Sequence, residues 1–342
     1  MTADKLTLPE ARVRVGCARA AGRLGAILRR VGCARDVADA VAAHLVEASR
    51  MGVESHGVVR VIQYVEQFRR GAEHADGMRA EARPAIVERD GLTEVDGDGG
   101  IGIVAMQLAL EHSLRRVERD GIVAVAVRNA GHTGRLGAFT EAAADASCMM
   151  ILIGGGNRAQ WRQVAPHGGR AAMLPTNPWS IAIPGGARGP VVLDFATGAI
   201  AGGWIYAARS AGALLPDGAL IDRHGRPSRD PQAYFDGGAI LPKGGALGYG
   251  LGLIAELIGE AMLGPVAGEA NSLMITMDAL RYNEQHRFRA VAETLLAELR
   301  ATPTADGFAR VEIPGERERE RATDDRIAVP ARTWAQILAL PN

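Results

Sequence analysis

The 342-residue sequence has few cysteines, few lysines and few aromatic residues. Cys17, Cys33 and Cys148 have no CxxC spacing, which fits a reducing compartment rather than a disulfide framework. Lys5 and Lys243 are the only lysines. Because 39 basic residues balance 39 acidic ones, the chain carries no excess positive charge for binding nucleic acid.

Long apolar runs are also missing. The most apolar stretch, 237–264, is interrupted by Lys243, Glu256 and Glu260, and no run approaches the roughly 20 residues that a membrane helix needs. Residues 1–5 are not followed by the apolar segment of an export signal. We therefore expect a cytoplasmic protein with no membrane contact.

Several motifs that would assign a chemistry are absent. The sequence has no HExxH, no GxSxG and no Walker lysine, and its eight histidines are scattered. We therefore expect no dedicated metal site.

The periodicity of apolar residues predicts an α/β fold. Helices are expected within 9–47 and over 58–70, where Gly71 ends the last one. Asp90-Gly91 lies between two extended runs and predicts a β-hairpin. Strands are then expected at 121–127, 148–153, 179–183, 190–194 and 272–277, and helices at 101–119, 134–146, 198–210, 249–263 and 284–300.

Residues 97–102 fit the GxGxxG pattern of a dinucleotide-binding turn. Two features argue against that function. The preceding strand belongs to a hairpin, whereas a Rossmann first strand lies inside a parallel sheet. The next strand ends in Arg128-Asn129, where an acidic residue would contact the ribose. We interpret the segment as a glycine-rich turn that begins a helix.

The first candidate site segment contains Ser55, His56 and Arg60. His56 and Arg60 are four residues apart, so they share one face if a helix begins here. Guanidinium holds a carboxylate in a bidentate manner, and imidazole exchanges a proton with a neighbouring carbonyl or alcohol. The alternative is a capping serine, a turn histidine and a surface arginine.

The second candidate is His132, which lies between Gly131 and Thr133-Gly134 just beyond a buried strand. Ligand groups collect at the carboxyl ends of strands in open α/β sheets, which favours an acid/base function. The alternative is a loop histidine that caps the next helix.

Three further segments follow apolar strands or begin helices. Gly154-Gly155-Gly156-Asn157 allows close backbone approach to a ligand, or forms a flexible loop. Asp194 orients an imidazole, contacts a cofactor hydroxyl or caps helix 198–210. The glycine loop 244–248 leads into a helix whose free N–H groups suit phosphate, with structural packing as the alternative. The Asn177-Pro178 bond is a candidate for the cis form.

Together and in this order, these segments resemble the malate/L-lactate dehydrogenase family that is distinct from the Rossmann-type enzymes. The resemblance covers about residues 10 to 316. It depends on Ser55-His56-Gly57, Arg60, Tyr64, Gly131-His132, Gly134, Val164-Ala165-Pro166, Gly168-Gly169, Thr176-Asn177-Pro178, Asp194, Ala196-Thr197, Gly225, Pro227, Asp230-Pro231, Leu241-Pro242, Gly244-Gly245, Gly248-Tyr249-Gly250-Leu251 and Pro314-Gly315-Glu316.

The resemblance implies a non-Rossmann NAD(P)-binding domain with a mixed sheet, a mainly helical second domain, and a homodimer with its active site near the subunit interface. We expect residues 1–75 and 300–342 to form the helical domain and 76–299 the cofactor domain. By position, the resemblance makes His132, His56, Arg60 and Asp194 catalytic candidates, and Ser55, His56, Arg60 and His132 substrate contacts. It implies cofactor contacts at Gly156, Asn157, Thr176, Asn177, Asp194, Phe195, Ala196, Gly244, Gly245, Leu247 and Gly248.

The sequence departs from the family around the cofactor. Ala246-Leu247 replaces a usual His-Lys pair, Gly198 replaces a Ser or Thr, and Trp204 stands where a lysine is common. We predict an oxidoreductase that transfers a hydride between NAD or NADP and a small 2-hydroxy/2-oxo acid or cyclic imino acid. The alternative is a cofactor-deficient relative that binds ligands or has altered chemistry.

Overall fold

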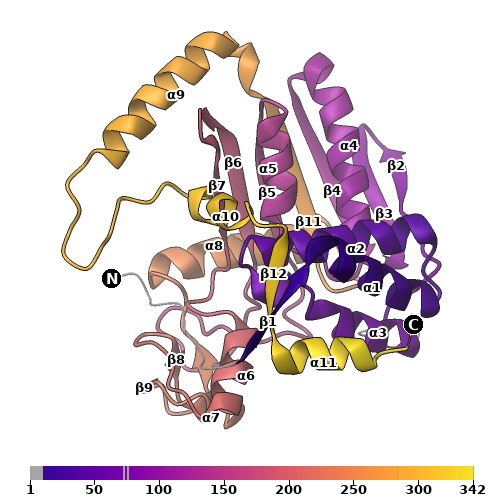
Figure 1. The fold of residues 1–342 in the computed structure, drawn as a ribbon, viewed down its shortest axis with the longest axis vertical. Helices are drawn as coiled ribbons and strands as arrows, with labels where there is room; N and C mark the ends of the chain where they lie inside the picture. Colours follow the sequence, from indigo (N-terminus) through magenta and orange to yellow (C-terminus); the bar gives the residue numbers. More distant parts are fainter. Residues whose placement is uncertain (1–10, 72–73, 75–76, 283, 342) are drawn as a thin grey trace.

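The computed structural model describes residues 11–71, 74, 77–282 and 284–341. Residues 1–5, on which the expectation of no export signal depends, lie outside the described residues. Its centre is a seven-stranded mixed sheet in the order β2-β3-β4-β11-β5-β6-β7 (Figure 1). The strands are β2 (Ala85–Arg89), β3 (Leu92–Gly100), β4 (Ile122–Ala130), β5 (Cys148–Gly155), β6 (Trp179–Gly186), β7 (Gly189–Phe195) and β11 (Asn271–Asp278).

Only the β3–β4 pair in this sheet is parallel, and α4 (Gly102–Asp120) connects these two strands. The other neighbours pair in antiparallel fashion. The hairpin predicted at Asp90-Gly91 is confirmed, and both turn residues have positive φ (52° and 78°), as its tight turn requires.

Helices cover both faces of the sheet. On one face α4 and α5 (Gly137–Asp145) bury a cluster that includes Val125, Met150 and Leu152. Because side chains alternate along a strand, Gly155 of β5 points to the other face. There it meets α8 (Ala246–Glu256), which continues into the π-helical turn η2 (Leu257–Met262).

The two ends of the described chain pack together beside the sheet. β1 (Arg12–Gly16) pairs with β12 (Arg326–Pro330), a ribbon that the periodicity did not predict. One apolar cluster joins it to α1 (Cys17–Arg30), α2 (Arg35–Arg50), α3 (Arg60–Arg70) and α11 (Ala331–Ala339). α3 ends at Gly71 as predicted, with φ at 71°. This helical layer places α3 against the end of β4.

A smaller unit lies at the lower left of Figure 1. It contains the three-stranded sheet β10-β8-β9, formed by β8 (Leu220–Ile221), β9 (Pro227–Ser228) and β10 (Ala239–Ile240). It also contains α6 (Gly202–Ala211) and α7 (Gln232–Phe235), and a separate apolar cluster supports it. The remaining elements are η1 (Glu54–His56), η3 (Ala279–Arg281), α9 (Gln285–Arg300) and α10 (Glu316–Arg321).

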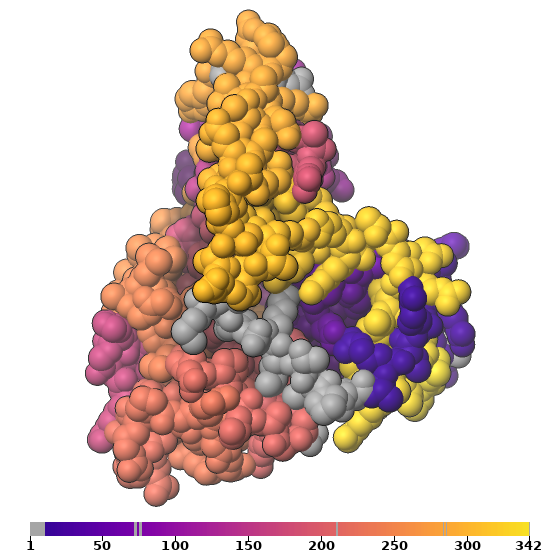
Figure 2. All heavy atoms as spheres, turned by 60° about the vertical axis from the view of Figure 1, so that its left-hand side comes forward, coloured from indigo at the N-terminus to yellow at the C-terminus, as the bar shows by residue number. Residues whose placement is uncertain are grey.

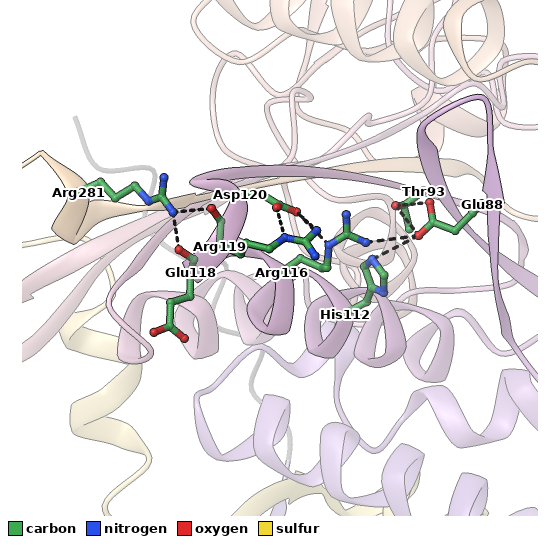
Figure 3. Close-up of polar contacts among 8 residues, drawn as sticks. All are labelled: Glu88, Thr93, His112, Arg116, Glu118, Arg119, Asp120 and Arg281. Atoms are coloured by element: carbon green, nitrogen blue, oxygen red, sulfur yellow. Dashed lines mark hydrogen bonds and ion pairs between the residues drawn. The ribbon is translucent and has the colours of Figure 1, made fainter.

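A polar network on the outer side of α4 attaches neighbouring segments to it (Figure 3). Glu88 of β2 lies 3.8 Å from both His112 Nε2 and Arg116 Nη1, and Arg116 Nε donates to Asp120 at 2.9 Å. Arg281 donates to the carbonyl of Arg119 at 2.6 Å. Exposed ion pairs of this kind contribute at most about 1 kcal/mol each, so the network positions the hairpin and η3 rather than forming a site.

The GxGxxG segment is not a turn. Residues 97–100 belong to β3, and Gly102 begins α4. A Cβ on Gly97 would lie 2.7 Å from that of Ala130, and one on Gly100 would overlap Ala82. These glycines therefore allow β3 to pack closely against the end of β4 and the segment before β2, in place of the expected glycine-rich turn.

Candidate active site

The loop after β4 presents His132 to the helical layer. Gly131 N donates to the carbonyl of Gly100 at 2.7 Å, which fixes the loop on the end of β3. A side chain on Gly131 would overlap Met78, and one on Gly134 would overlap His44. The glycines on either side of His132 are thus needed for close packing, and His132 itself is 7% exposed.

The ring of His132 is held by two hydrogen bonds at Nδ1. Tyr64 Oη lies 2.7 Å away, and the backbone N–H of Gly134 donates at 3.2 Å. Because a backbone N–H can only donate, Nδ1 accepts, and the proton of the neutral ring is on Nε2. The arrangement fixes the tautomer that offers Nε2–H to a ligand.

His56 lies against His132. Their ring centroids are 5.3 Å apart and the rings are inclined by 26°, while Ser55 Oγ lies 2.9 Å from His56 Nδ1. Burial, with a smaller contribution from Arg60, lowers the pKa of His56 to about 3. The same two causes place the pKa of His132 well below its ordinary value. Both imidazoles are therefore neutral near pH 7.

Arg60 begins α3 and supplies the positive charge of the site. Its Nε donates to the carbonyl of Ser55 at 2.5 Å and its Nη1 donates to Gln63 Oε1 at 2.6 Å. η1, not α3, contains Ser55 and His56, so the expectation of one helix face shared by His56 and Arg60 is wrong. Arg60 comes near His56 because its guanidinium folds back on the η1 turn at Ser55.

A cavity of about 480 Å³ adjoins this group. Its wall includes Gln67, Met78, Gly131, Trp161 and Glu269. Gln67 is two turns beyond Arg60 on α3, and Glu269 precedes β11, where its N–H donates to the carbonyl of Ala130 at 2.9 Å. The cavity therefore opens beside the ends of β4 and α3.

The glycine loop 154–157 is packed against α8 and η2. A Cβ on Gly156 would lie 2.6 Å from the carbonyl carbon of Gly259. The Glu256 carboxylate accepts from Gly156 N at 3.0 Å and from Asn177 Nδ2 at 2.9 Å. Asn157 donates to the carbonyl of Glu269. The loop and Asn177 are thus joined through Glu256, and the Asn177–Pro178 bond is trans.

Thr176 and the α8 loop meet at Thr197. The N–H and Oγ1 of Thr197 both donate to the Thr176 carbonyl at 2.8 Å, and Lys243 N donates to the carbonyl of Thr197 at 2.8 Å. Gly248 N then donates to the carbonyl of Lys243 at 2.9 Å. These hydrogen bonds therefore join the segments at Thr176, Thr197 and Lys243 to one another at the start of α8, although some 70 residues separate the first from the last.

The N-terminus of α8 is exposed and no side chain caps it. Gly244 and Gly245 have φ of 63° and 65°, and a Cβ on Gly244 would have open space around it. Leu247 in the first turn is 70% exposed. The arrangement offers an anion such as phosphate the backbone N–H groups and the positive end of the helix dipole, but Leu247 adds no charge.

Asp194, at the end of β7, holds the start of α5. Its Oδ2 accepts from Gly137 N at 2.8 Å. The proposed cap on helix 198–210 is therefore wrong, since α6 begins at Gly202 and Asp194 bonds a different helix. Asp194 therefore bonds the first residue of α5 and not an imidazole.

The sequence interpretation missed three residues at this site. Tyr64 was noted only as part of a resemblance, although it lies one turn after Arg60 on the same helix face, which was a usable signal. Gln67 lies on that face as well. Glu269 follows a loop of low periodicity, and no local pattern in the sequence indicates its position. In the described residues, no three metal-ligating side chains gather.

Comparison with known proteins identifies the class of protein. A profile described as malate/L-lactate dehydrogenase matches residues 18–338, and the chain belongs to this family. The chain is 35% identical over 322 residues to an L-lactate dehydrogenase of Cupriavidus necator, covering 88% of this chain and 89% of that one.

Other relatives differ in their substrates. A Delta(1)-pyrroline-2-carboxylate/Delta(1)-piperideine-2-carboxylate reductase of Pseudomonas putida is 32% identical, covering 93% of this chain and 94% of its own. The fold is similar to that of a dehydrogenase from Sinorhizobium meliloti, with a TM-score of 0.84, 31% identity and coverage of 97% and 98%. The predicted α/β fold and family are thus confirmed, and the relatives imply a nicotinamide cofactor.

Proposed function

We propose that the protein reduces a small 2-oxo acid or cyclic imino acid, or oxidises the corresponding product, with NAD or NADP. The observation that supports this most directly is that the rings of His132 and His56 lie against each other although 76 residues separate them in the sequence. Arg60 is close enough to add to the effect of burial in lowering the pKa of both imidazoles. The bound nicotinamide supplies or accepts the hydride; the protein orients the substrate and controls one proton.

His132 is the residue that faces the reacting group in this proposal. Its Nε2–H donates a hydrogen bond to the carbonyl oxygen or imine nitrogen, while Tyr64 and Gly134 hold Nδ1. A neutral imidazole in this tautomer polarises a carbonyl as an electrophile, and the low pKa keeps it neutral. Arg60 binds the carboxylate, supported by Ser55 through its carbonyl.

The residues around α8 fit the cofactor in part. The uncapped N-terminus with Gly244, Gly245 and Gly248 would hold a phosphate through backbone N–H groups, with Lys243 exposed beside it. Asp194, Phe195, Ala196, Thr176, Asn177, Gly156 and Asn157 line the adjoining segments and remain proposed contacts. Leu247 removes a charged contact, so we expect weaker cofactor binding than a lysine there would give.

A substrate panel tests the function. Purified protein is assayed with 2-oxo acids and cyclic imino acids, using NADH and NADPH, and we expect turnover that His132→Ala lowers at least a hundredfold. Isothermal titration with each cofactor addresses the alternative of a cofactor-deficient relative. Binding of neither cofactor at millimolar concentration would contradict the proposed function and support that alternative.

We also infer that the protein is a homodimer with its site near the subunit interface. α9 stands out at the top of the molecule (Figure 2), and Val291, Leu295 and Leu299 form an apolar stripe on it that is 60%, 55% and 43% exposed. Ile254 of α8 and Leu257 of η2 are 48% and 55% exposed. A second copy of the chain would cover these residues. Light scattering of Leu295→Glu, with Glu298→Gln as control, tests this: a wild-type monomer would contradict it.

Two further proposals concern organisation and location. We infer that residues 1–75 and 300–342 form one helical domain and 76–299 the cofactor domain, which the joint packing of both chain ends supports. Limited proteolysis that releases either unit would test this division. The free thiols of Cys17, Cys33 and Cys148 suit a reducing compartment, so we place the protein in the cytoplasm.

A further inference from the structure

A further buried histidine, His44 of α2, contacts the loop that carries His132. His44 is 8% exposed, and its ring stacks on Phe139 of α5 with the centroids 5.4 Å apart and the planes inclined by 25°. Its Nε2 accepts a hydrogen bond from the backbone N–H of Arg135 at 2.9 Å. Because a backbone N–H can only donate, the proton of the neutral His44 ring is on Nδ1.

Gly134 allows His44 to come this close. A Cβ on Gly134 would lie 2.2 Å from His44 Nε2, and the residue has φ of 74°. Gly134 N itself donates to His132 Nδ1, so two consecutive N–H groups of the backbone each bond a different imidazole. Only the φ and ψ of Gly134 separate these two peptide groups, and glycine restricts both angles weakly. The bond from Arg135 N to His44 therefore limits how far the Gly134 N–H can turn away from His132.

Of the two groups at His132 Nδ1, only the Gly134 N–H fixes the tautomer. The hydroxyl of Tyr64 can donate or accept, so it pairs with Nδ1 whether or not that nitrogen is protonated. The backbone N–H requires an unprotonated Nδ1, which leaves the proton on Nε2. Without that N–H, Nδ1–H could donate to Tyr64, and Nε2 would then have no proton to offer to a ligand.

We propose that His44 is a positioning residue for His132: by accepting from the Arg135 N–H, it holds the backbone of residues 133–135 and thereby the Nε2–H tautomer of His132. This proposal rests on the function proposed above, in which His132 Nε2–H binds the reacting group. His44 comes from the helical layer and His132 from the loop after β4, so the contact sets this loop against α2.

The His44 ring is in the protonation state that this role requires. Burial, with a smaller contribution from the charge of Arg135, lowers the pKa of His44 to about 4. The ring is therefore neutral near pH 7, and Nε2 has a free lone pair for the Arg135 N–H. His44 is also close enough to His56 and His132 for a charge on it to oppose their protonation, so a neutral His44 fits the neutral pair.

Two amides of different length test the proposal. His44→Gln places an amide oxygen near the position of Nε2 and keeps the acceptor, whereas the shorter side chain of His44→Asn reaches only as far as Nδ1 and loses it. His286→Gln is the control, since the His286 side chain is 81% exposed. With the substrates and cofactors named above, we expect His44→Asn to lower kcat at least tenfold and to change KM less than threefold. His44→Gln and the control should stay within threefold of the wild type in both parameters.

Nitrogen-15 NMR of labelled histidines reads the tautomer directly, without substrate or cofactor. His132→Ala assigns the signals of His132. In the wild type and in His44→Gln, we expect an unprotonated Nδ1 and a protonated Nε2 on His132; in His44→Asn, we expect signals of a mixture of the two tautomers. A purely structural role of His44 would lower the urea midpoint of His44→Asn and leave both the tautomer and kcat unchanged.

The outcomes separate the two proposals. An unchanged His132 tautomer in folded His44→Asn would overturn the positioning role, and so would equal losses of kcat in His44→Asn and His44→Gln. Absence of turnover by the wild type would instead contradict the proposed function, because the NMR measurement needs no turnover. If His44→Asn does not fold, His44→Leu replaces it, since leucine keeps much of the bulk and has no acceptor.

Discussion

Tyr64→Phe removes one hydroxyl from the interior of the site and leaves the ring in place. Tyr64 is fully buried, and its Oη lies 2.7 Å from His132 Nδ1. Gly134 N–H remains at 3.2 Å, so the tautomer is kept but the ring is held by one bond rather than two. Losing a buried hydrogen bond of this kind costs about 1–1.5 kcal/mol, which corresponds to roughly a tenfold change in rate.

Steady-state kinetics measure this effect. We expect kcat to fall about tenfold with little change in KM, because the hydroxyl orients His132 and does not hold the carboxylate. Tyr282→Phe is the matched control, since Tyr282 is 78% exposed, and it should leave both parameters unchanged. An unaltered kcat in Tyr64→Phe would refute the positioning role. A loss as large as that of His132→Ala would make Tyr64 a direct participant.

Three further predictions concern charge, pH and the glycine segment. Arg60→Lys should raise KM for the carboxylate substrate at least tenfold with a smaller effect on kcat, since an ammonium lacks the planar fork; an unchanged KM would remove Arg60 from the carboxylate site. Burial lowers the pKa of His44 to about 4, so below pH 6.5 the unfolded chain binds a proton at this residue that the folded chain does not. The contribution of His44 to the free energy of unfolding should therefore fall by about 1.4 kcal/mol per pH unit toward pH 4. Urea titrations of His44→Asn should show a shallower dependence on pH than those of the control His286→Gln. Gly99→Val should lower the free energy of unfolding by about 1–3 kcal/mol, since Gly99 has φ of 68°, and calorimetry should find cofactor affinity unchanged; its loss in a folded variant would restore the Rossmann interpretation.

The central elements of the fold were predictable because each has a strong local pattern. The Asp90-Gly91 hairpin, α3 with its Gly71 terminus, and the alternating strands and helices of residues 101–210 and 246–300 all follow from turn chemistry and periodicity. The β1–β12 ribbon was not predictable, because its strands are more than 300 residues apart and each is only five residues long. Such pairing depends on tertiary context that no sequence window contains.

The site was predictable in its chemistry and not in its geometry. His56, Arg60 and His132 were recognised by residue type and by family order, and the structure brings them together. No local pattern indicates that Arg60 folds back on Ser55, or that residues 97–100 extend β3 instead of forming a turn. Glu269 reaches the site only because β11 lies between β4 and β5 in the sheet.

The most direct test of the account is a comparison of wild-type protein with His132→Ala under saturating NADH or NADPH, after both have been shown by calorimetry to bind the cofactor. The account predicts that the wild type reduces a cyclic imino acid or a 2-oxo acid, and that the variant binds cofactor with similar affinity but turns over at least a hundredfold more slowly. Full activity in the variant would contradict the assignment of His132 to the reacting group.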